Sequence, residues 1–520
     1  MIRRALAGAA LLLAPLGLAA RPGAAPFPGT RELVAAQAAP AAAGATDDNV
    51  KAACGICHAV PPPEILPRAA WRAEIARMML IRDGKPEPVG PVGLSTRMVL
   101  LSDDLVSVLR YYQQRAPEQL PAATPWPDAD SRGFAVHGFT PAGAPPLPAI
   151  SHVRALDLAG NGTLEIVGSD MRQGLMVAGR ATDPSGALRV IAQIPNPSNF
   201  QLFDFDSDGR KDLLVADLGS FQPEDHLRGA VEWLRRTPAG RYAPFRVEGW
   251  PRVANVEPAD FNGDGKPDLA VASFGWRKVG QLAVLENTTT DYGHPSFVTH
   301  TIDPRPGSIH AIPVDMNGDG KLDLVVLFSQ QFESVVVYLN TGNFTFSPQT
   351  IYTAPHPNWG STGIEVVDLD GDGDLDVLMT HGDTFDDQIL KPYHGIQWLE
   401  NVGDGKFVEH ALADMPGVMR AEAGDLDGDG DMDIVACAFV AQPVDRRDQP
   451  GAPSLVWLEQ TSKGVFVKRT LERKPPRHAT LDLVDVDGDG DLDIVVGNFM
   501  VGQEGLPWIE VWENLRKKRL

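Results

Sequence analysis

Short apolar runs recur throughout residues 132–520, and each follows an acidic loop that contains glycine. Examples are Leu213–Ala216, Leu324–Leu327 and Ile494–Val496. Runs of this length, bounded by turn residues, predict strands. A second apolar stretch follows each loop, as in Trp398–Asn401 and Trp457–Gln460, and a Gly-containing turn then leads to another strand. The pattern predicts about four strands in each repeating unit.

The acidic loops share one spacing, with side-chain oxygens at positions 1, 3, 5 and 9 and Gly at position 6. Six strong copies are formed by Asp204, Asp206, Asp208 and Asp212; Asp260, Asn262, Asp264 and Asp268; Asp315, Asn317, Asp319 and Asp323; Asp368, Asp370, Asp372 and Asp376; Asp425, Asp427, Asp429 and Asp433; and Asp485, Asp487, Asp489 and Asp493. An earlier copy has Asp157, Asn161 and Glu165 but Ala159 at position 3. Alternate side chains can turn their oxygens inward while Gly permits the sharp turn, so the spacing predicts up to about seven calcium sites, the first weak or empty.

An EF-hand has the same early ligands but needs Glu at position 12 and helices on both sides. Position 12 is Val215 in the second copy and Met379 in the fifth, and the flanking segments are strand-like. Each loop therefore joins two strands. Seven units of four strands predict a mostly β protein with a seven-bladed β-propeller over residues 132–520.

The last unit ends at Trp512–Leu515 and lacks a final strand. The segment Arg132–His137 precedes the first acidic loop and looks like that strand. We expect it to complete the last blade, which would close the ring and protect its edges.

With these motifs, residues 132–520 resemble the FG-GAP/VCBS repeat family, the blade type of the integrin α head. The resemblance implies a seven-bladed propeller with calcium in several blade loops.

The N-terminus has a basic start, Met1–Arg4, an apolar stretch, Ala5–Leu18, and two small residues, Ala19 and Ala20. This order is typical of a secretory signal over residues 1–20, and an uncleaved helical anchor is the alternative. Residues 21–46 are rich in Ala and Pro and predict a flexible linker. We expect an exported protein, periplasmic or extracellular, with no transmembrane segment after signal cleavage.

The segment Cys54–His58 has the Cys-x-x-Cys-His spacing of covalent haem attachment. It predicts one haem c, bound through Cys54 and Cys57, with His58 as the proximal iron ligand. The alternatives are a redox cysteine pair or half of a zinc site. Apolar periodicity predicts helices over 71–80 and 102–115, the second with Ser102 as N-cap.

Residues 47–120 resemble the class I cytochrome c family, which implies a small all-α haem domain. The stretch from Trp71 to Arg77 and Met78 resembles the Trp…Arg-Met helix of some cytochrome subunits, and the resemblance implies Met78 as the distal ligand. Met79 and Met98 are the rival ligands, and a role in core packing is the alternative for all three. A Pro-rich linker, 121–131, would join the two domains.

The 520 residues carry a net charge of −22, which argues against binding to nucleic-acid backbones. Seven divalent ions would reduce that charge to about −8, an ordinary value for a soluble surface. Three cysteines do not make a disulfide framework, and Cys437 lies in a predicted strand as a buried apolar residue.

One residue stands five positions before the start of each acidic loop. Strand register places these residues near the central funnel, opposite the calcium side. They are His152, Asn199, Asn255, His310, Gly363, Arg420 and Thr480. A polar ring there could bind a small-molecule or glycan ligand, or its members could be ordinary loop residues. The group His381, Asp383, Asp386 and Asp387 could bind a metal, although a solvated acidic loop is the expectation.

Three functions fit this organisation. The first is an electron carrier whose propeller docks a redox partner protein or a ligand. The second is a dehydrogenase that oxidises a substrate in the funnel and passes electrons to the haem, which takes only one electron at a time. The third is a recognition module with an accessory haem.

Overall fold

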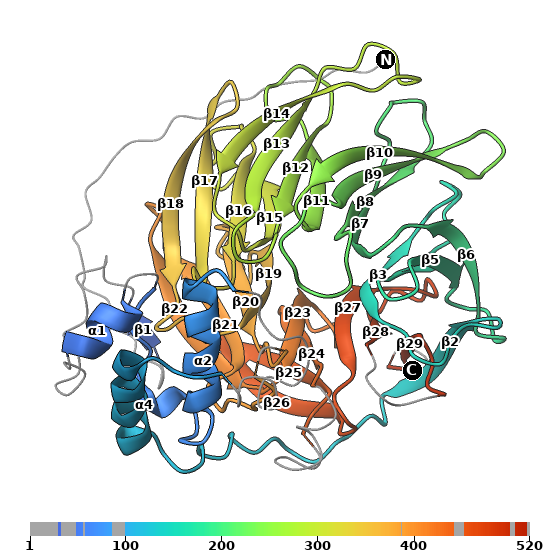
Figure 1. Cartoon of the computed structure of the whole chain (residues 1–520). Coiled ribbons are helices and arrows are strands. Elements are labelled where there is room, and N and C mark those ends of the chain that lie inside the picture. The colour runs from blue at the N-terminus through green and yellow to red at the C-terminus, as the bar shows by residue number, and fades with distance from the viewer. Residues whose placement is uncertain are drawn as a thin grey trace, which may run out of the picture.

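The computed structural model describes residues 30–32, 48–55, 58–85, 99–385, 387–440, 452–499 and 505–516. Antiparallel sheets dominate, and the described α-helices all lie between residues 48 and 115 (Figure 1). The signal-like segment 1–20, Cys57, Met98 and Asp386 lie outside the described residues. No helix in the described ranges is long and apolar enough to cross a membrane.

Four-stranded antiparallel groups repeat along the body of the protein, and their strands are paired in chain order. The groups with sheets of their own are β7 (Pro197–Phe203), β8 (Asp212–Asp217), β9 (Gly229–Arg236) and β10 (Tyr242–Trp250); β11 (Val253–Ala259), β12 (Asp268–Ser273), β13 (Gln281–Asn287) and β14 (Phe297–Asp303); β15 (Ser308–Val314), β16 (Asp323–Phe328), β17 (Ser334–Gly342) and β18 (Thr345–Thr353); β19 (Ser361–Val367), β20 (Asp376–His381), β21 (Gly395–Asn401) and β22 (Phe407–Asp414); and β23 (Val418–Gly424), β24 (Asp433–Ala438), β25 (Leu455–Ser462) and β26 (Val465–Glu472). A short strand from the Ala/Pro-rich segment, β1 (Thr30–Glu32), pairs with β22.

The remaining sheet has eight strands in the order β27-β28-β29-β2-β6-β5-β4-β3. Its strands are β2 (Phe134–Pro141), β3 (Ile150–Leu156), β4 (Glu165–Asp170), β5 (Leu175–Arg180), β6 (Ala187–Gln193), β27 (His478–Val484), β28 (Asp493–Asn498) and β29 (Ile509–Asn514). Strand β2 pairs with β29 from Phe134↔Asn514 to Phe139↔Ile509, but it meets β6 at only two residues, in parallel. The prediction that an N-terminal strand completes the last unit is confirmed.

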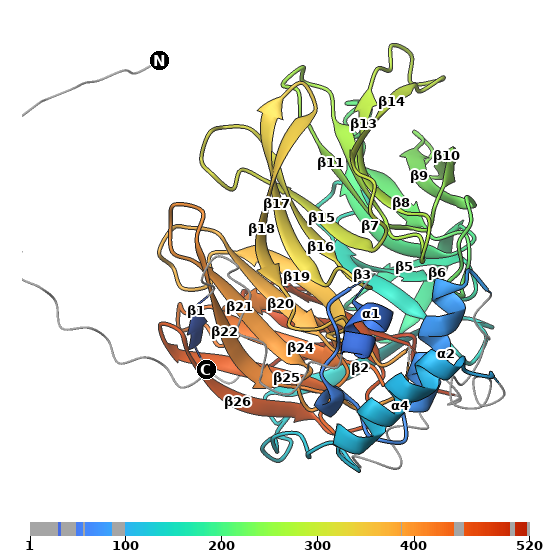
Figure 2. The same ribbon diagram turned by 60° about the vertical axis from the view of Figure 1, so that its left-hand side comes forward.

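The first strands of the groups lie side by side in a closed order. Strands β3, β7, β11, β15, β19, β23 and β27 each contact the next, and β27 contacts β3. The sheets are arranged around a common centre, as in a β-propeller (Figures 1 and 2). Apolar side chains fill the spaces between neighbouring sheets, for example Val325 and Leu327 of β16 against Ile364 of β19. Burial of these faces is the main stabilising contribution to the fold.

The helical segment contains α1 (Asp48–Cys54), the 3₁₀-helix η1 (Pro63–Ile65), α2 (Trp71–Arg82) and α4 (Asp103–Arg115). Both predicted helices are therefore present. Ser102 stands at the N-cap of α4 with an extended backbone, but its side chain makes no capping hydrogen bond to the backbone. Trp71 stacks on Tyr112 with ring centroids 3.8 Å apart.

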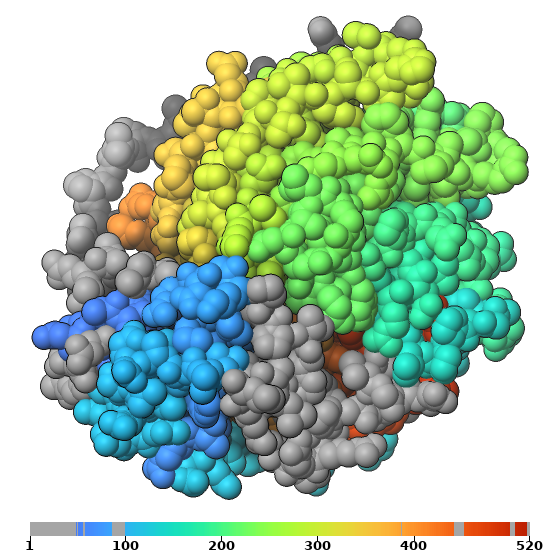
Figure 3. Space-filling model, viewed as in Figure 1, coloured from blue at the N-terminus to red at the C-terminus, as the bar shows by residue number. Residues whose placement is uncertain are grey.

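The helices pack against the sheet body. Ile389 and Tyr393, from the loop between β20 and β21, join the apolar core of the helical segment. In both ribbon views the helices lie beside the sheets (Figures 1 and 2), and the space-filling view shows them against the body (Figure 3). Helix α2 buries even Glu74 and Arg77, because it has neighbours on several sides.

The Pro-rich linker follows the surface of the body. The buried side chain of Trp126 inserts between sheets beside Trp398, and its Nε1 donates to the carbonyl of Asp414 at 2.9 Å. Ala129 pairs with Thr470 of β26. The linker therefore holds the helical segment against the body.

Candidate functional site

A cavity of about 1070 Å³ lies between the helical segment and the sheet body. Its helical side is lined by Cys54, His58, Trp71, Met78 and Met79, among others. Its other side is lined by loops of the sheet body, including residues Trp276, Gln330, Glu333, Asp383 and Phe385. The volume is at the upper end of that of small-molecule sites, and its mixed apolar and polar lining is typical of them.

The predicted haem residues that the structure describes all line this cavity. Cys54 ends α1, and burial raises the pKa of its thiol. His58 Nδ1 lies 2.8 Å from the carbonyl oxygen of Ala59. If Nδ1 carries the proton and donates it there, Nε2 keeps its lone pair, which is the usual state of an iron-binding histidine.

Two neighbouring methionines of α2 differ in their surroundings. Met78 is half-buried and lines the cavity, whereas Met79 is 7% exposed and belongs to the apolar core of the helical segment although it also reaches the cavity. A side chain committed to the core is less able to serve as an iron ligand. The donor set and the cavity fit a haem.

The acidic loops form one repeated structure at the opposite end of the first strands. In the copy that begins at Asp425, the carboxylate of Asp425 accepts the backbone N–H groups of Gly428 and Gly430 at 2.7 and 3.1 Å. Gly430 has φ of +98°, which a residue without a side chain adopts easily. The carboxylates of four loops converge to within 4.8 Å: Asp204, Asp206 and Asp208; Asp368, Asp370 and Asp376; Asp425, Asp427 and Asp433; and Asp485, Asp487 and Asp489.

The aspartate at position 9 is buried in every strong copy and ties the loop to the third strand. Asp433, for example, accepts the N–H of Gln460 at 2.8 Å and that of Leu426 at 3.1 Å. The side chain of Gln460 in turn donates to the carbonyl of Met432. This contact explains why an Asn or Gln recurs at the end of the third strand in most units.

Burial and neighbouring carboxylates raise the pKa of several position-9 aspartates, to about 7 in Asp376 and Asp493. A bound divalent cation would relieve both effects. In the first copy, by contrast, Glu165 forms an ion pair with Arg189 at 2.5 Å. Together with Ala159, this pair leaves that loop the poorest in available oxygens.

The predicted ring of channel residues is partly assembled. Burial lowers the pKa of His152 well below its usual value, and the nearby charges of Arg154 and Arg420 lower it further. His152 also accepts the N–H of Phe200 at 3.2 Å, and Asn255 accepts that of Ala311 at 3.1 Å. These side chains therefore join adjacent first strands.

A second ring, two residues further along the same strands, was not predicted. Its charged members include Glu365, Glu422 and Asp482, which accept backbone N–H groups of the next first strand at 2.7 to 3.2 Å. Arg154 pairs with Asp482 at 2.9 Å and Arg420 with Glu422 at 3.1 Å. The alternation of side chains along a strand was the signal that could have found this ring.

The comparisons with known proteins identify the repeats. The family described as FG-GAP-like repeat matches residues 204–271, 260–326, 315–379 and 381–436. The chain carries FG-GAP-like repeats. None of the curated proteins matches the chain.

Several solved structures are similar to this chain at low identity. Virginiamycin B lyase from Staphylococcus aureus is 10% identical, with a TM-score of 0.45 and coverage of 73% of this chain and 99% of that one. BBS1N, crystallised with ARL6DN, is 10% identical, with a TM-score of 0.42 and coverages of 76% and 98%. A protein assigned as a 6-phosphogluconolactonase from Bacteroides fragilis is 13% identical, with a TM-score of 0.45 and coverages of 68% and 98%.

The matched FG-GAP-like repeats include five of the acidic loops, and the loops that begin at Asp157 and Asp485 lie outside them. The loop at Asp485 nevertheless repeats the same contacts, since Asp493 accepts the N–H groups of Asn514 and Val486. The loop geometry therefore extends beyond the matched repeats.

The loop after β20 differs from the predicted solvated acidic loop. His381 is buried and stacks on Trp359, and Asp387 forms a buried ion pair with Lys391 at 2.9 Å. These two residues do not belong to a solvated acidic loop, because the loop is covered where it meets the helical segment. Asp386 lies outside the described residues.

Glu333 is a cavity residue that the sequence analysis missed. It is 5% exposed, has φ of +35°, and accepts the N–H of Ser361 at 3.0 Å. Burial raises its pKa to about 8, and Asp383 adds repulsion. A carboxyl group in this state can hold or release a proton near neutral pH.

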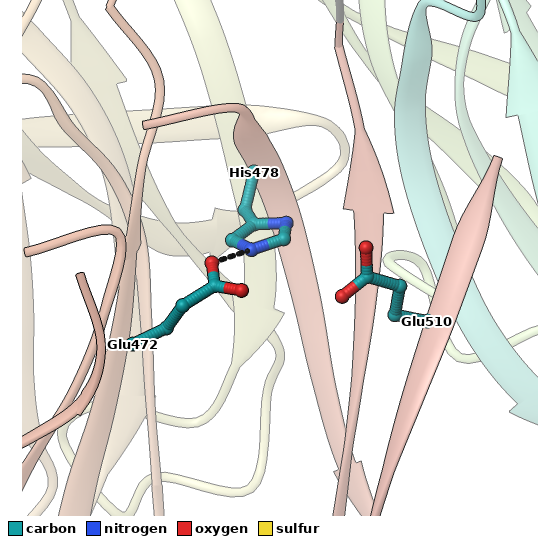
Figure 4. Close-up of side chains that lie close together, drawn as sticks. All are labelled: Glu472, His478 and Glu510. Atoms are coloured by element: carbon teal, nitrogen blue, oxygen red, sulfur yellow. Dashed lines mark hydrogen bonds and ion pairs between the residues drawn. The ribbon is translucent and has the colours of Figure 1, made fainter. Parts of the chain in front are cut away.

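A second buried group of carboxylates, away from the cavity, is paired with basic side chains. Glu472, His478 and Glu510 lie together at the ends of β26, β27 and β29 (Figure 4). His478 Nε2 lies 2.9 Å from Glu472, and Arg477 pairs with Glu510 at 2.9 Å and with Glu472 at 3.4 Å. We interpret the group as an ion-pair network that joins two sheets, because these partners balance both carboxylates.

Replacement of Glu257 by Gln should stabilise the protein at high pH only. Burial raises the pKa of this channel carboxyl from 4.5 to about 7, and Gln201 and Asn255 donate to it. The folded state keeps the proton longer than the unfolded state, so wild-type stability falls as pH rises from about 4.5 through about 7. We expect E257Q to gain about 2 kcal/mol at pH 8.5 and little at pH 5, measured by thermal unfolding at constant calcium. The exposed change E248Q is the control, and an equal gain at both pH values would refute the assignment.

Proposed function

We propose that this protein is an exported monohaem c-type cytochrome fused to a calcium-stabilised, seven-bladed propeller, and that it transfers electrons with the propeller as a docking platform. The observation that carries the proposal is the single cavity lined both by Cys54, His58 and Met78 and by loops of the sheet body. A reactant bound to those loops would lie next to the haem.

The seven-bladed assignment rests on the closed order of seven first strands. It treats the eight-stranded sheet as two blades, because β2 and β6 share only a two-residue parallel pairing. The strand from the N-terminal side would then close the ring in the last blade.

Cys54 and Cys57 would hold the haem through thioether bonds, and His58 and Met78 would supply the ligands to its iron. A haem ligated by His and Met supplies a one-electron donor or acceptor that is closed to small ligands. The chain's part is to orient His58 through Ala59, to provide the apolar wall of Trp71, and to exclude water by packing the helices against the sheets.

The concave shape of the cavity, lined on two sides, would suit a small molecule as the docked reactant. Thr362, Ile309 and Met419, from three first strands, line its inner side. Glu333 favours a second candidate function, a dehydrogenase that oxidises its substrate in the funnel, because its carboxyl can accept a proton there. A recognition module with an accessory haem would not require the haem residues to face the same cavity as the propeller loops.

Export follows from the signal-like residues 1–20, and it agrees with the chemistry, since haem is attached to Cys-x-x-Cys-His motifs outside the cytoplasm. Calcium would fill the six strong loops, and the first copy would bind weakly. A redox partner protein would then exchange electrons with the haem from outside the cavity.

Removal of calcium should destabilise the propeller. A chelator should lower the melting temperature by roughly 20 °C, because each of the six filled sites contributes about 2.7 kcal/mol when free calcium is 100 times its dissociation constant. Calorimetry with and without calcium measures the effect. D425N should lower the calcium stoichiometry by one, whereas D157N should leave it unchanged. An unchanged melting temperature would mean that the loops are metal-free turns.

Replacement of Met78 by Ala should remove the distal ligand. The purified M78A protein should carry covalent haem but show the absorption spectrum of a five-coordinate or misligated iron and a lower reduction potential. M79A is the matched control and should keep the wild-type spectrum. A normal spectrum for M78A would transfer the role to Met79 or Met98.

The ferric holoprotein, mixed without oxygen with pools of small metabolites, should be reduced by at least one pool. If the protein is a dehydrogenase, E333Q should slow that reduction at least tenfold, whereas E248Q, which changes an exposed residue that does not line the cavity, should not. Fast reduction by a partner cytochrome and by no small molecule would instead make the propeller a protein-docking surface. A purified protein without covalent haem would refute the proposal altogether.

A further inference from the structure

A cluster of phenylalanines lies on the face of the sheet body that carries the cavity loops. Each member comes from the loop that follows the second strand of its group: Phe221 after β8, Phe385 after β20, Phe439 after β24 and Phe499 after β28. Phe439 and Phe499 are buried, whereas Phe385 is 48% exposed and lines the cavity. The cluster therefore presents an aromatic surface to the cavity.

The ring of Phe385 is supported from behind by the rest of the cluster. It stacks on Phe439 with ring centroids 5.2 Å apart and meets the edge of Phe499 at 6.1 Å. Phe439 and Phe499 are 5.1 Å apart, and Phe221 stacks on Phe499 at 6.3 Å. A ring held in this way loses little freedom when a second flat ring stacks on it, so the surface is preorganised for binding.

A buried carboxyl group belongs to the same corner of the cavity. Glu333 accepts the N–H of Ser361 at 3.0 Å, and the N–H of Asp383 donates to the carbonyl of the preceding residue, Gly360, at 3.1 Å. The carboxylate of Asp383 accepts the N–H of Phe385 at 2.7 Å. Glu333, Asp383 and Phe385 all line the cavity. An aromatic face and two carboxyl groups are thus linked by a short chain of hydrogen bonds.

The chemistry of this corner favours a flat aromatic molecule that carries hydroxyl groups. Phe385 offers a π face without a polar atom, and carboxyl oxygens accept hydrogen bonds from hydroxyl groups. Burial raises the pKa of Glu333 to about 8, so at pH 7 this group attracts a cationic ligand only weakly. The proposed haem takes one electron at a time, and a hydroquinone can give up its electrons singly.

We propose that this corner of the cavity binds a hydroquinone as the substrate of the proposed oxidoreductase, with its ring on Phe385 and a hydroxyl group hydrogen-bonded to Glu333. The redox step rests on the proposed function, whereas the binding site does not. Oxidation of a hydroquinone to the quinone releases two electrons and two protons. The electrons would pass singly to ferric haem, which the redox partner protein reoxidises each time. The protons would pass to water or to the ionised form of Glu333.

Equilibrium dialysis of the purified full-length protein with calcium tests the site. The probe is resorcinol, a dihydroxybenzene that forms no simple quinone. It should bind about tenfold more tightly than cyclohexane-1,3-diol, which carries the same hydroxyl groups on a ring that is not flat. F385A should weaken resorcinol binding by about tenfold, and F385Y should retain it. V298A, which changes an exposed apolar side chain of β14 that does not line the cavity, is the matched control.

The site is overturned if resorcinol does not bind, if F385A or cyclohexane-1,3-diol gives the affinity of wild type and resorcinol, or if D-glucose or benzylamine binds more tightly. If F385A does not fold, F385L keeps the apolar bulk without the flat ring and should still weaken binding by about threefold.

The redox step has its own readout. Below saturation, F385A should slow the reduction of ferric haem by 2,6-dimethoxyhydroquinone by about tenfold, and an equal rate would overturn the assignment of the substrate. Resorcinol binding by a protein without covalent haem would support the site and refute the electron-transfer function. Covalent haem without resorcinol binding would do the reverse.

Discussion

The buried aspartate at position 9 of each strong loop is the contact on which the sheets depend. Its two oxygens accept one N–H from the loop and one from the third strand, the latter at 2.7 to 2.8 Å in all six copies. The same residue thus fixes the turn between the first two strands and the start of the outer hairpin. A carboxylate in this buried position is costly unless charge compensates it, and the cation that would do so is the one the loop spacing predicts.

Because the loop end of each sheet is fixed by this repeated contact, the opposite end can vary. The loops there differ in length and composition from sheet to sheet, and they supply Trp276, Gln330, Glu333 and Phe385 to one cavity. First strands are held to one another by side chains that accept backbone N–H groups of the next strand, as Asp482 does from Ala155. A rigid frame with variable loops at one face is the usual way for a binding site to be built.

The sequence predicted the features that follow a fixed or repeated residue spacing. The acidic spacing and the apolar runs were enough to place the strands, and the end of the last unit was enough to pair Phe134–Phe139 with β29. The sequence could not predict contacts between segments that have no shared period. Burial of His381 and the Asp387–Lys391 ion pair arise because the helical segment covers that loop, and no pattern in the loop itself encodes this cover. Likewise, Glu333 carries no motif; its raised pKa comes from the walls around it.

The Pro-rich linker fixes the position of the helical segment, which its composition alone does not indicate. A Pro-rich connection could have left the helical segment free to move, with no defined distance between it and the sheet body. Trp126 is instead buried between sheets, and Arg473 reaches the carbonyl of Trp126 at 2.5 Å. With Ile389 and Tyr393 packed into the helical core at another point, the segment is held at two separate places. Two attachments fix the orientation of the helical segment as well as its distance from the sheets. The geometry of the cavity is therefore determined by the fold and does not depend on transient contact between two mobile domains.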